Sequence, residues 1–283
     1  MNVKPTRGAR IAFMIGVVLI MFFVLFPYFW LVCSSFKTSN EIFSVVPTLF
    51  PKAPTLEGYK YALSIGARGP KLVPTLKNSL TVASITAICT IFFAATGGYA
   101  IGRQNFPGKK YLVVFILLAQ MFQGPVIMIP WYRMAAGMGI INTKTALVLI
   151  YLTATIPICV WLMSGFAKTL PYELEEAASI DGCNPFRTFI SIIMPLLKGG
   201  LVSILIYAFI IAWNDYQYAL ILTTSAKAKT VQLTIGELMG SMGIINWGGI
   251  TACGVIVTIP AIILFSCIQR YLIEGLTAGA VKG

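Results

Sequence analysis

Residues 11–36 read IAFMIGVVLIMFFVLFPYFWLVCSSF and contain no charged side chain. A helix needs about 20 mainly apolar residues to cross the hydrocarbon core of a bilayer, so this stretch can cross it once. Lys4, Arg7 and Arg10 precede the stretch, as basic residues precede the core of a secretory signal peptide. Such a core has only about 7–15 residues. We therefore interpret residues 11–36 as a retained first membrane span.

The composition of the whole chain also indicates a lipid environment. Of 283 residues, 58% are hydrophobic and 11% are charged, whereas about 25% of residues are charged in an ordinary soluble domain. The net charge of +12 suggests nucleic acid at first sight. The basic residues are scattered singly, however, and a nucleic-acid binder gathers them on one face. We expect no nucleic-acid partner and interpret these residues as anchors at the membrane interface.

Five more long apolar segments follow the first. Together they predict an all-α integral membrane protein with six transmembrane helices, formed by a single domain over residues 1–283. No low-complexity tract or repeat of fixed period is visible. The approximate spans are residues 11–36, 78–102, 111–132, 145–167, 199–222 and 250–270.

Charge in the short loops predicts the orientation of these spans. Six spans place both termini on one side, and short loops rich in Lys and Arg face the cytoplasm. Three basic residues precede the first span, and three more lie within residues 103–110. We therefore expect both termini in the cytoplasm. The segment 37–77, which contains five prolines, is then an ordered or semi-ordered external loop.

Side chains that commonly carry catalysis or bind metals are scarce. Histidine, the commonest general base and metal ligand, is absent. None of the six cysteines forms a Cys-x-x-Cys pair, so the sequence suggests neither a zinc site nor a disulfide framework. No nucleophile–base pair is discernible, which argues against a membrane-embedded hydrolase or transferase. We expect no catalytic residue and no metal site.

The acidic cluster of the chain lies between the fourth and fifth predicted spans, where residues 170–182 read LPYELEEAASIDG. Pro171 suits the first position of a helix, and the glutamates that follow suit the positive end of the helix dipole. Gly182 suits a left-handed C-terminal cap. Asn184 and Pro185 then begin a second helix that ends near Pro195. The sequence therefore predicts a short helix-turn-helix inside a cytoplasmic loop, residues 168–198.

One face of the first helix of this hairpin is expected to be thin. Residues three and four apart are neighbours on a helix, which places Leu174, Ala177, Ala178 and Asp181 on one face. The two alanines leave room for a partner to approach closely. The alternative is a solvated amphipathic hairpin that has no partner.

The spacing in this hairpin resembles the signature of permease subunits of binding-protein-dependent ABC importers. Glu176-Ala177-Ala178 is followed by three residues, Gly182, nine residues, and Ile192-x-Met194-Pro195. Met194 stands where leucine is usual, and Cys183 and Gly199-Gly200 are further departures. The resemblance covers nearly the whole chain, through Asn78-Ser79-Leu80, Tyr99-Ala100 with Arg103, and Trp213-Asn214. Residues 275–283 resemble the end of the smaller maltose-type permease subunit.

The resemblance implies a permease subunit that carries a sugar or oligosaccharide into the cytoplasm. Its hairpin would be a coupling helix that docks into a groove on a separate ATPase subunit. ATP and Mg²⁺ would bind to that subunit, because this chain has no Gly-x-x-x-x-Gly-Lys-Ser/Thr loop and is expected to bind no cofactor itself. The implied ATPase-subunit interface comprises Glu175, Glu176, Ala177, Ala178, Asp181, Gly182, Ile192, Pro195, Val281, Lys282 and Gly283.

The same resemblance implies a multi-subunit assembly in the cytoplasmic (inner) membrane of a prokaryote. Its other members would be a second, non-identical permease subunit, two ATPase subunits and an extracellular or periplasmic substrate-binding protein. The external stretch 223–249 would contact this binding protein. Four of its residues, Gly236, Gly240, Ser241 and Gly243, would form a mobile finger.

Asp215 is an acidic residue well inside a predicted span, and an ionisable group at membrane depth is a candidate for function. With Asn214 it would line a substrate pathway; the other interpretation is a structural role at the aqueous end of a helix. The alternative function is an ion-coupled secondary transporter. Such proteins use carboxylate or histidine relays at membrane depth. Apart from Arg270 at the end of the last one, the other five apolar segments contain no ionisable side chain besides cysteine and tyrosine, which disfavours this alternative.

Overall fold

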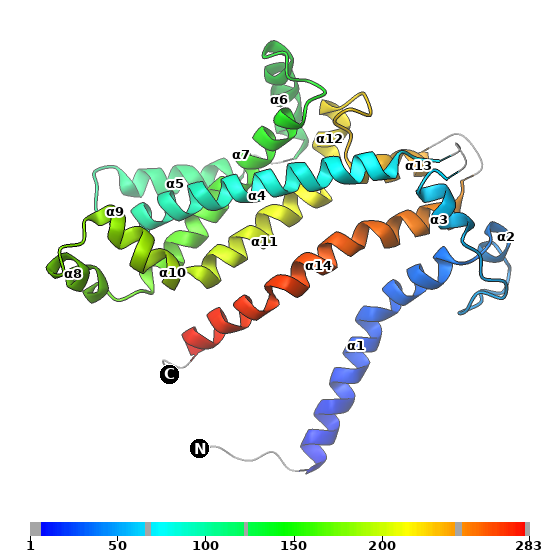
Figure 1. Cartoon of the computed structure of the whole chain (residues 1–283), viewed down its shortest axis with the longest axis horizontal. Coiled ribbons are helices and arrows are strands. Elements are labelled where there is room, and N and C mark those ends of the chain that lie inside the picture. The colour runs from blue at the N-terminus through cyan, green and yellow to red at the C-terminus, as the bar shows by residue number, and fades with distance from the viewer. Residues whose placement is uncertain (1–6, 66–68, 122–123, 241–244, 281–283) are drawn as a thin grey trace. The chain divides into compact units, whose positions relative to one another are not determined.

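The computed structural model describes residues 7–65, 69–121, 124–240 and 245–280, and this part of the chain contains helices and no strand. Figure 1 shows the course of the chain. The elements are α1 (Arg7–Ser35), α2 (Ser39–Ile42), α3 (Glu57–Ala62), α4 (Leu72–Arg103), α5 (Lys109–Ala119), α6 (Pro125–Gly137), α7 (Lys144–Lys168), α8 (Glu173–Ile180), α9 (Pro185–Thr188), the π-helix η1 (Phe189–Ile193), α10 (Met194–Leu196), α11 (Lys198–Asn214), α12 (Gln217–Leu222), α13 (Val231–Gly240) and α14 (Trp247–Ala280).

The chain divides into two compact units. The first contains Met1–Leu72 and Glu237–Ile259, and the second contains Val73–Gly236 and Pro260–Gly283. The first unit therefore holds α1, α2, α3 and the beginning of α14. The second unit holds most of α4 and every element from α5 to α12.

In the first unit, the segment after α1 is ordered by contacts with both neighbouring helices. The hydroxyl groups of Ser35 and Tyr59 are hydrogen-bonded at 2.8 Å. The start of α14 approaches α3 closely, since a Cβ at Gly58 would lie 2.5 Å from the carbonyl oxygen of Gly248. The described residues of the proline-rich loop thus form a defined structure, as the sequence predicts.

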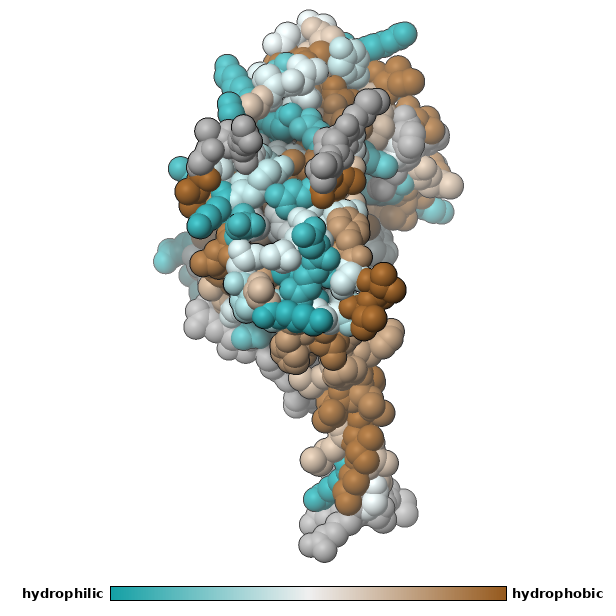
Figure 2. All heavy atoms as spheres, turned by 90° about the vertical axis from the view of Figure 1, so that its right-hand side faces the viewer, coloured by the Kyte–Doolittle hydropathy of each residue, from teal (hydrophilic) through white to brown (hydrophobic). Residues whose placement is uncertain are grey.

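Four described helices are long and apolar enough to cross a membrane. They are Gly8–Ser35, Leu72–Arg103, Lys144–Lys168 and Trp247–Gln269. A fifth is added if Pro185–Leu196 and Lys198–Asn214, which meet at 76°, are counted as one bent span. No residue is buried in the most apolar window of α1, whose side chains form the exposed brown column at the bottom of Figure 2. The chain is therefore a multi-pass membrane protein, and the number of six spans stays a prediction.

Two of the predicted spans are not single helices. Residues 111–132 are shared between α5 and α6, and residues 199–222 are shared between α11 and α12. Gly124, just before α6, has a φ of +78°, which is incompatible with a continuing right-handed helix. Asp215, between α11 and α12, has an extended backbone. Apolar composition predicted the length of these segments but not the breaks within them.

The core of the second unit is built on α7, which packs closely against α4. A Cβ at Gly98 would lie 2.5 Å from the Cβ of Met163, and a Cβ at Gly102 would lie 2.9 Å from that of Ala167. Small residues four apart allow two helix backbones to approach in this way. Within the same pair of helices, the buried hydroxyls of Thr90 and Thr155 are hydrogen-bonded at 2.7 Å. The two helices are thus joined by close packing and by a polar contact.

Replacement of Gly98 by alanine should lower the stability of the protein by about 1–3 kcal/mol, because the added methyl group overpacks a close helix contact. Gly165 in α7 has open space at its Cβ position. Gly165→Ala should therefore leave stability unchanged or raise it by up to about 1 kcal/mol through helix propensity. The measurement is the midpoint of thermal unfolding for both variants in one detergent. Equal midpoints would contradict the close α4–α7 contact.

Candidate functional site

The second unit ends, on one side, in a helical hairpin of residues 170–196, which we call the acidic hairpin (Figure 1). Its first helix, α8, is followed by Gly182, whose φ of +77° provides the predicted left-handed cap. Asn184 then caps the second helix, since its side-chain oxygen accepts a hydrogen bond from the backbone N–H of Arg187 at 2.8 Å. The predicted helix-turn-helix is present. It begins at Glu173, two residues later than Pro171 suggests.

The side chain of Arg103, at the end of α4, holds the start of this hairpin. Only 1% of the side chain is exposed. Its Nε donates to the carboxylate of Glu175 at 2.7 Å. Its two terminal nitrogens donate to the backbone carbonyls of Leu170 at 2.7 Å and of Pro171 at 3.0 Å. The guanidinium also lies over the ring of Tyr172, 3.6 Å from its centre. A planar, permanently charged fork suits this combination of contacts, which a lysine could not reproduce.

Sequence reasoning did not assign Arg103 a role in the hairpin. A signal was available, because Arg103 is a cation that ends an apolar span and three glutamates lie in the loop after the fourth span. Nothing in the local pattern, however, pairs one glutamate with it. Glu175, one of the predicted interface residues, thus pairs with Arg103 of the same chain. The surface of α8 that a partner could contact depends on the other residues of this helix.

The two alanines of the signature have different surroundings. Ala178 is 3% exposed and packs inside the hairpin. Ala177 is exposed, as are Glu176, Asp181 and Gly182. The exposed face of α8 therefore contains one of the two alanines that the sequence places there, and that alanine is Ala177.

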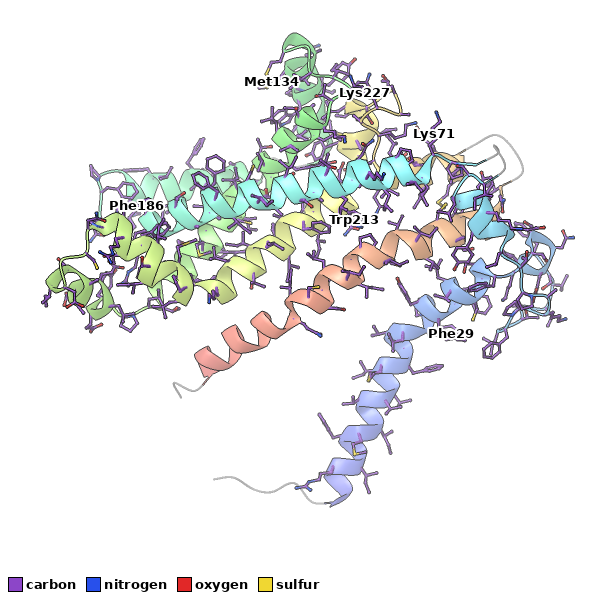
Figure 3. The ribbon with its side chains drawn as sticks, in the orientation of Figure 1. Phe29, Lys71, Met134, Phe186, Trp213 and Lys227 are labelled. Carbon is purple, nitrogen blue, oxygen red and sulfur yellow. The ribbon has the colours of Figure 1, made fainter. Side chains whose placement is uncertain are left out.

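Two large apolar side chains beside the turn are also exposed to solvent. Ile180 is 87% exposed and Phe186, labelled in Figure 3, is 73% exposed. The sequence did not single them out, because an apolar residue at a helix end carries no periodic signal. Among the other predicted interface residues, Pro195 is exposed and Ile192 is half-buried. Val281, Lys282 and Gly283 lie outside the described residues.

At the other predicted contact region, the loop between α12 and α13 is fixed by two asparagines. The Asn78 amide donates to the carbonyls of Lys227 and Lys229 at 3.2 and 3.0 Å. The side-chain oxygen of Asn142 accepts from the backbone N–H of Ser225 at 3.0 Å. These contacts hold the loop from α4 and from the turn between α6 and α7, so residues 223–230 form a defined structure.

The glycines of the proposed finger have different roles. A Cβ at Gly236, in α13, would collide with the ring of Tyr216. The absence of a side chain at Gly236 therefore allows this ring to pack against α13. Gly240 has no described neighbour within 4 Å of its Cβ position, so close packing does not require a glycine there. Ser241 and Gly243 lie outside the described residues.

The carboxylate of Asp215 is occupied by neighbours. One of its oxygens accepts hydrogen bonds from the Tyr151 hydroxyl at 2.7 Å and from the Ala219 backbone N–H at 3.0 Å. The other oxygen accepts from the backbone N–H of Tyr218 at 3.3 Å. Asp215 therefore caps α12 and links it to α7, which favours the structural interpretation, whereas Asn214 beside it is exposed. No group of three or more metal-ligating side chains occurs within the described part of the chain.

Replacing Arg103 by glutamine should loosen the acidic hairpin without unfolding the helices. The change removes a charge-assisted hydrogen bond and leaves buried acceptors unpaired, and we expect a loss of about 1–3 kcal/mol. Amide hydrogen exchange of residues 173–182 should accelerate, and Arg103→Lys should restore it only in part. Arg133→Gln, at an exposed cation of α6, is the control. Unchanged exchange in Arg103→Gln would show that these contacts do not hold the hairpin.

Comparison with known proteins shows the family and the fold of the chain. The family described as "Binding-protein-dependent transport system inner membrane component" matches residues 91–277. Among solved structures, the chain is similar to one from a bacterial ABC transporter involved in the import of the acidic polysaccharide alginate. The TM-score is 0.79 at 20% identity, with 95% of this chain and 99% of that chain covered, so the two share a fold.

Relatives are similar over nearly their whole length. The trehalose/maltose transport system permease protein MalG of Thermococcus litoralis is 36% identical over 276 residues, which cover 97% of each chain. The inner membrane ABC transporter permease protein YcjP of Escherichia coli is 33% identical over 278 residues, again 97% of each. The diacetylchitobiose uptake system permease protein DasC of Streptomyces coelicolor is 33% identical over 260 residues, 92% of each. The chain therefore belongs to the family of inner membrane components of binding-protein-dependent transport systems.

Proposed function

We propose that this chain is a permease subunit of an ATP-driven importer that carries a sugar or oligosaccharide into the cytoplasm. The acidic hairpin carries the proposal. Arg103 fixes it to the end of α4 through four contacts, while Ala177, Asp181 and Ile180 remain exposed. A rigid element with an exposed face suits a part that receives force from another subunit, and a free solvated hairpin would have no need of the buried arginine.

The substrate class rests on the relatives. One is named for trehalose and maltose and another for diacetylchitobiose, which are all small saccharides. We infer that the chain forms the pathway and performs no catalysis. Because it lacks a phosphate-binding loop, ATP and Mg²⁺ would bind to two separate ATPase subunits.

The proposed assembly contains a second, non-identical permease subunit and an external substrate-binding protein, with both termini of this chain in the cytoplasm. Residues 223–249 would contact the binding protein. The hydrogen bonds from Asn78 and to Asn142 support this proposal because they hold residues 223–230 in place at the base of this stretch.

The path of the force follows from the contacts of the hairpin. Closure of the ATPase subunits would displace α8, and Arg103 would pass the displacement to α4. Since α4 packs on α7 without side chains at Gly98 and Gly102, the two helices would move together. The other arm of the hairpin runs through η1 and α10 into α11, which would move with it.

Replacing Ala177 by tryptophan should uncouple transport while the protein remains folded. Ala177 is exposed, so the indole would clash with a docked subunit and not with the hairpin; an overpacking penalty of about 1–3 kcal/mol corresponds to roughly 5–150-fold weaker docking. The measurement is sugar-stimulated ATP hydrolysis by the reconstituted complex, with assembly followed separately. Wild-type assembly and hydrolysis in this variant would show that the outer face of α8 has no docking role.

Ser179→Trp is a matched control, because Ser179 is exposed on the same helix and about 200° around its axis from Ala177. It should keep more coupling than Ala177→Trp.

Gly182→Val tests the turn itself. No atom lies within 4 Å of its Cβ position, so the strain comes from its positive φ and should amount to about 1–3 kcal/mol. Coupling should fall in this variant because α8 is misdirected.

A further inference from the structure

The loop between α2 and α3 contains a short uncharged stretch, residues 43–51, which reads FSVVPTLFP and which we call the apolar loop. Its large apolar side chains are largely exposed: Val45 is 99% exposed and Val46 is 75% exposed. Phe43, Leu49 and Phe50 are each more than half exposed. Scattered apolar side chains on a surface need no explanation, but a contiguous patch of them marks a contact site.

Two charged side chains that precede the apolar loop, Glu41 and Lys37, make contacts that fix its shape. The carboxylate of Glu41 accepts hydrogen bonds from the Thr48 hydroxyl at 2.7 Å and from the Lys52 backbone N–H at 2.8 Å. The bond from Thr48, and next the bond from Lys52, lowers the pKa of Glu41. The half-exposed Glu41 thus joins two positions of this segment, Thr48 and Lys52, and helps to fix its shape.

Lys37 also helps to fix the shape of the apolar loop. It is buried, its ammonium lies 4.5 Å from the centre of the Trp30 ring, and it donates a hydrogen bond to the carbonyl of Thr48. The underside of the apolar loop is therefore held by one cation and one anion from the chain just before it. This arrangement keeps the apolar side chains exposed, because the loop cannot roll over without breaking these bonds.

The apolar loop lies beside the end of a membrane span. The ring of Phe50 packs edge-on against that of Phe29 of α1, with 5.7 Å between the ring centres; Figure 3 labels Phe29 on this helix. Counting about 20 residues from Ile11 places the far boundary of the hydrocarbon core near Trp30. Phe29 is six residues, or about 9 Å, before the end of α1. Phe50 therefore reaches the depth of the boundary between acyl chains and headgroups.

We propose that residues 43–51 insert into the lipid headgroup region of the leaflet at the C-terminal end of α1 and anchor the protein there. Exposed apolar side chains continuous with an unburied apolar helix fit the acyl–headgroup boundary. Lys52 ends the apolar stretch and is exposed, where a lipid phosphate would be its neighbour. Lipid is favoured over a protein partner because Phe50 of the loop packs on Phe29 of α1, and α1 is long and apolar enough to cross a membrane.

The test places a photoreactive diazirine amino acid at Val46, in the full chain with its co-purifying subunits in native membranes. Val46 is exposed, so the replacement does not disturb packing. Ser39→diazirine is the control, since Ser39 is exposed and polar and lies at the start of α2. After illumination, mass spectrometry identifies the adduct. We expect severalfold more phospholipid adduct at position 46 than at position 39.

Two results would overturn the proposal: predominantly water adducts at both positions would place the loop in solvent, and a peptide adduct at position 46 would show that another protein covers it. A nitroxide at position 46 of a cysteine-free variant gives a second reading. Its collision rate with oxygen, relative to that with a water-soluble nickel complex, should be severalfold higher than at position 39. An equal ratio at the two positions would equally refute insertion.

Discussion

A guanidinium that is buried at the end of an apolar helix keeps its charge, and the local structure must therefore supply partners for its donors. Removing such a group from water costs several kcal/mol unless it is well paired. In this protein the partners of Arg103 are one carboxylate, two carbonyls and an aromatic ring, all from residues 170–175. The need to satisfy this one side chain fixes where α8 begins and how it is attached to α4.

The rigidity of the hairpin would have no consequence if the helix that holds it were free to slide. The close contact of α4 with α7 prevents this, because Met163 and Ala167 occupy the space that side chains at positions 98 and 102 would take. The buried pair of threonine hydroxyls adds a polar contact with a defined geometry. Hairpin, α4 and α7 are thus joined to one another by buried polar contacts and close packing. A π-helix such as η1 in the second arm is a common feature of functional sites.

Polar side chains fix the backbone in two loop regions, residues 223–230 and the loop after α1. Asn78 and Asn142 bind backbone groups of residues 223–230 and give that loop a single conformation. In the loop after α1, Lys37 and Glu41 are used in the same structural way, and the apolar side chains are left outside. Both arrangements satisfy buried or half-buried polar groups. They differ in the contact that we propose for each loop, which is with the binding protein in one case and with lipid in the other.

The sequence by itself determined the lipid environment, the approximate places of the long helices and the turn of the acidic hairpin. Each of these depends on composition or on backbone chemistry within a few residues, such as the positive φ of Gly182 and the cap of Asn184. Only the tertiary structure decided that Arg103 pairs with Glu175, that Asp215 pairs with Tyr151, and that Ala178 is buried while Ala177 is exposed. It also gave Gly236 a packing role against Tyr216. These features depend on contacts between segments far apart in the chain, and local periodicity carries no information about which distant groups will meet.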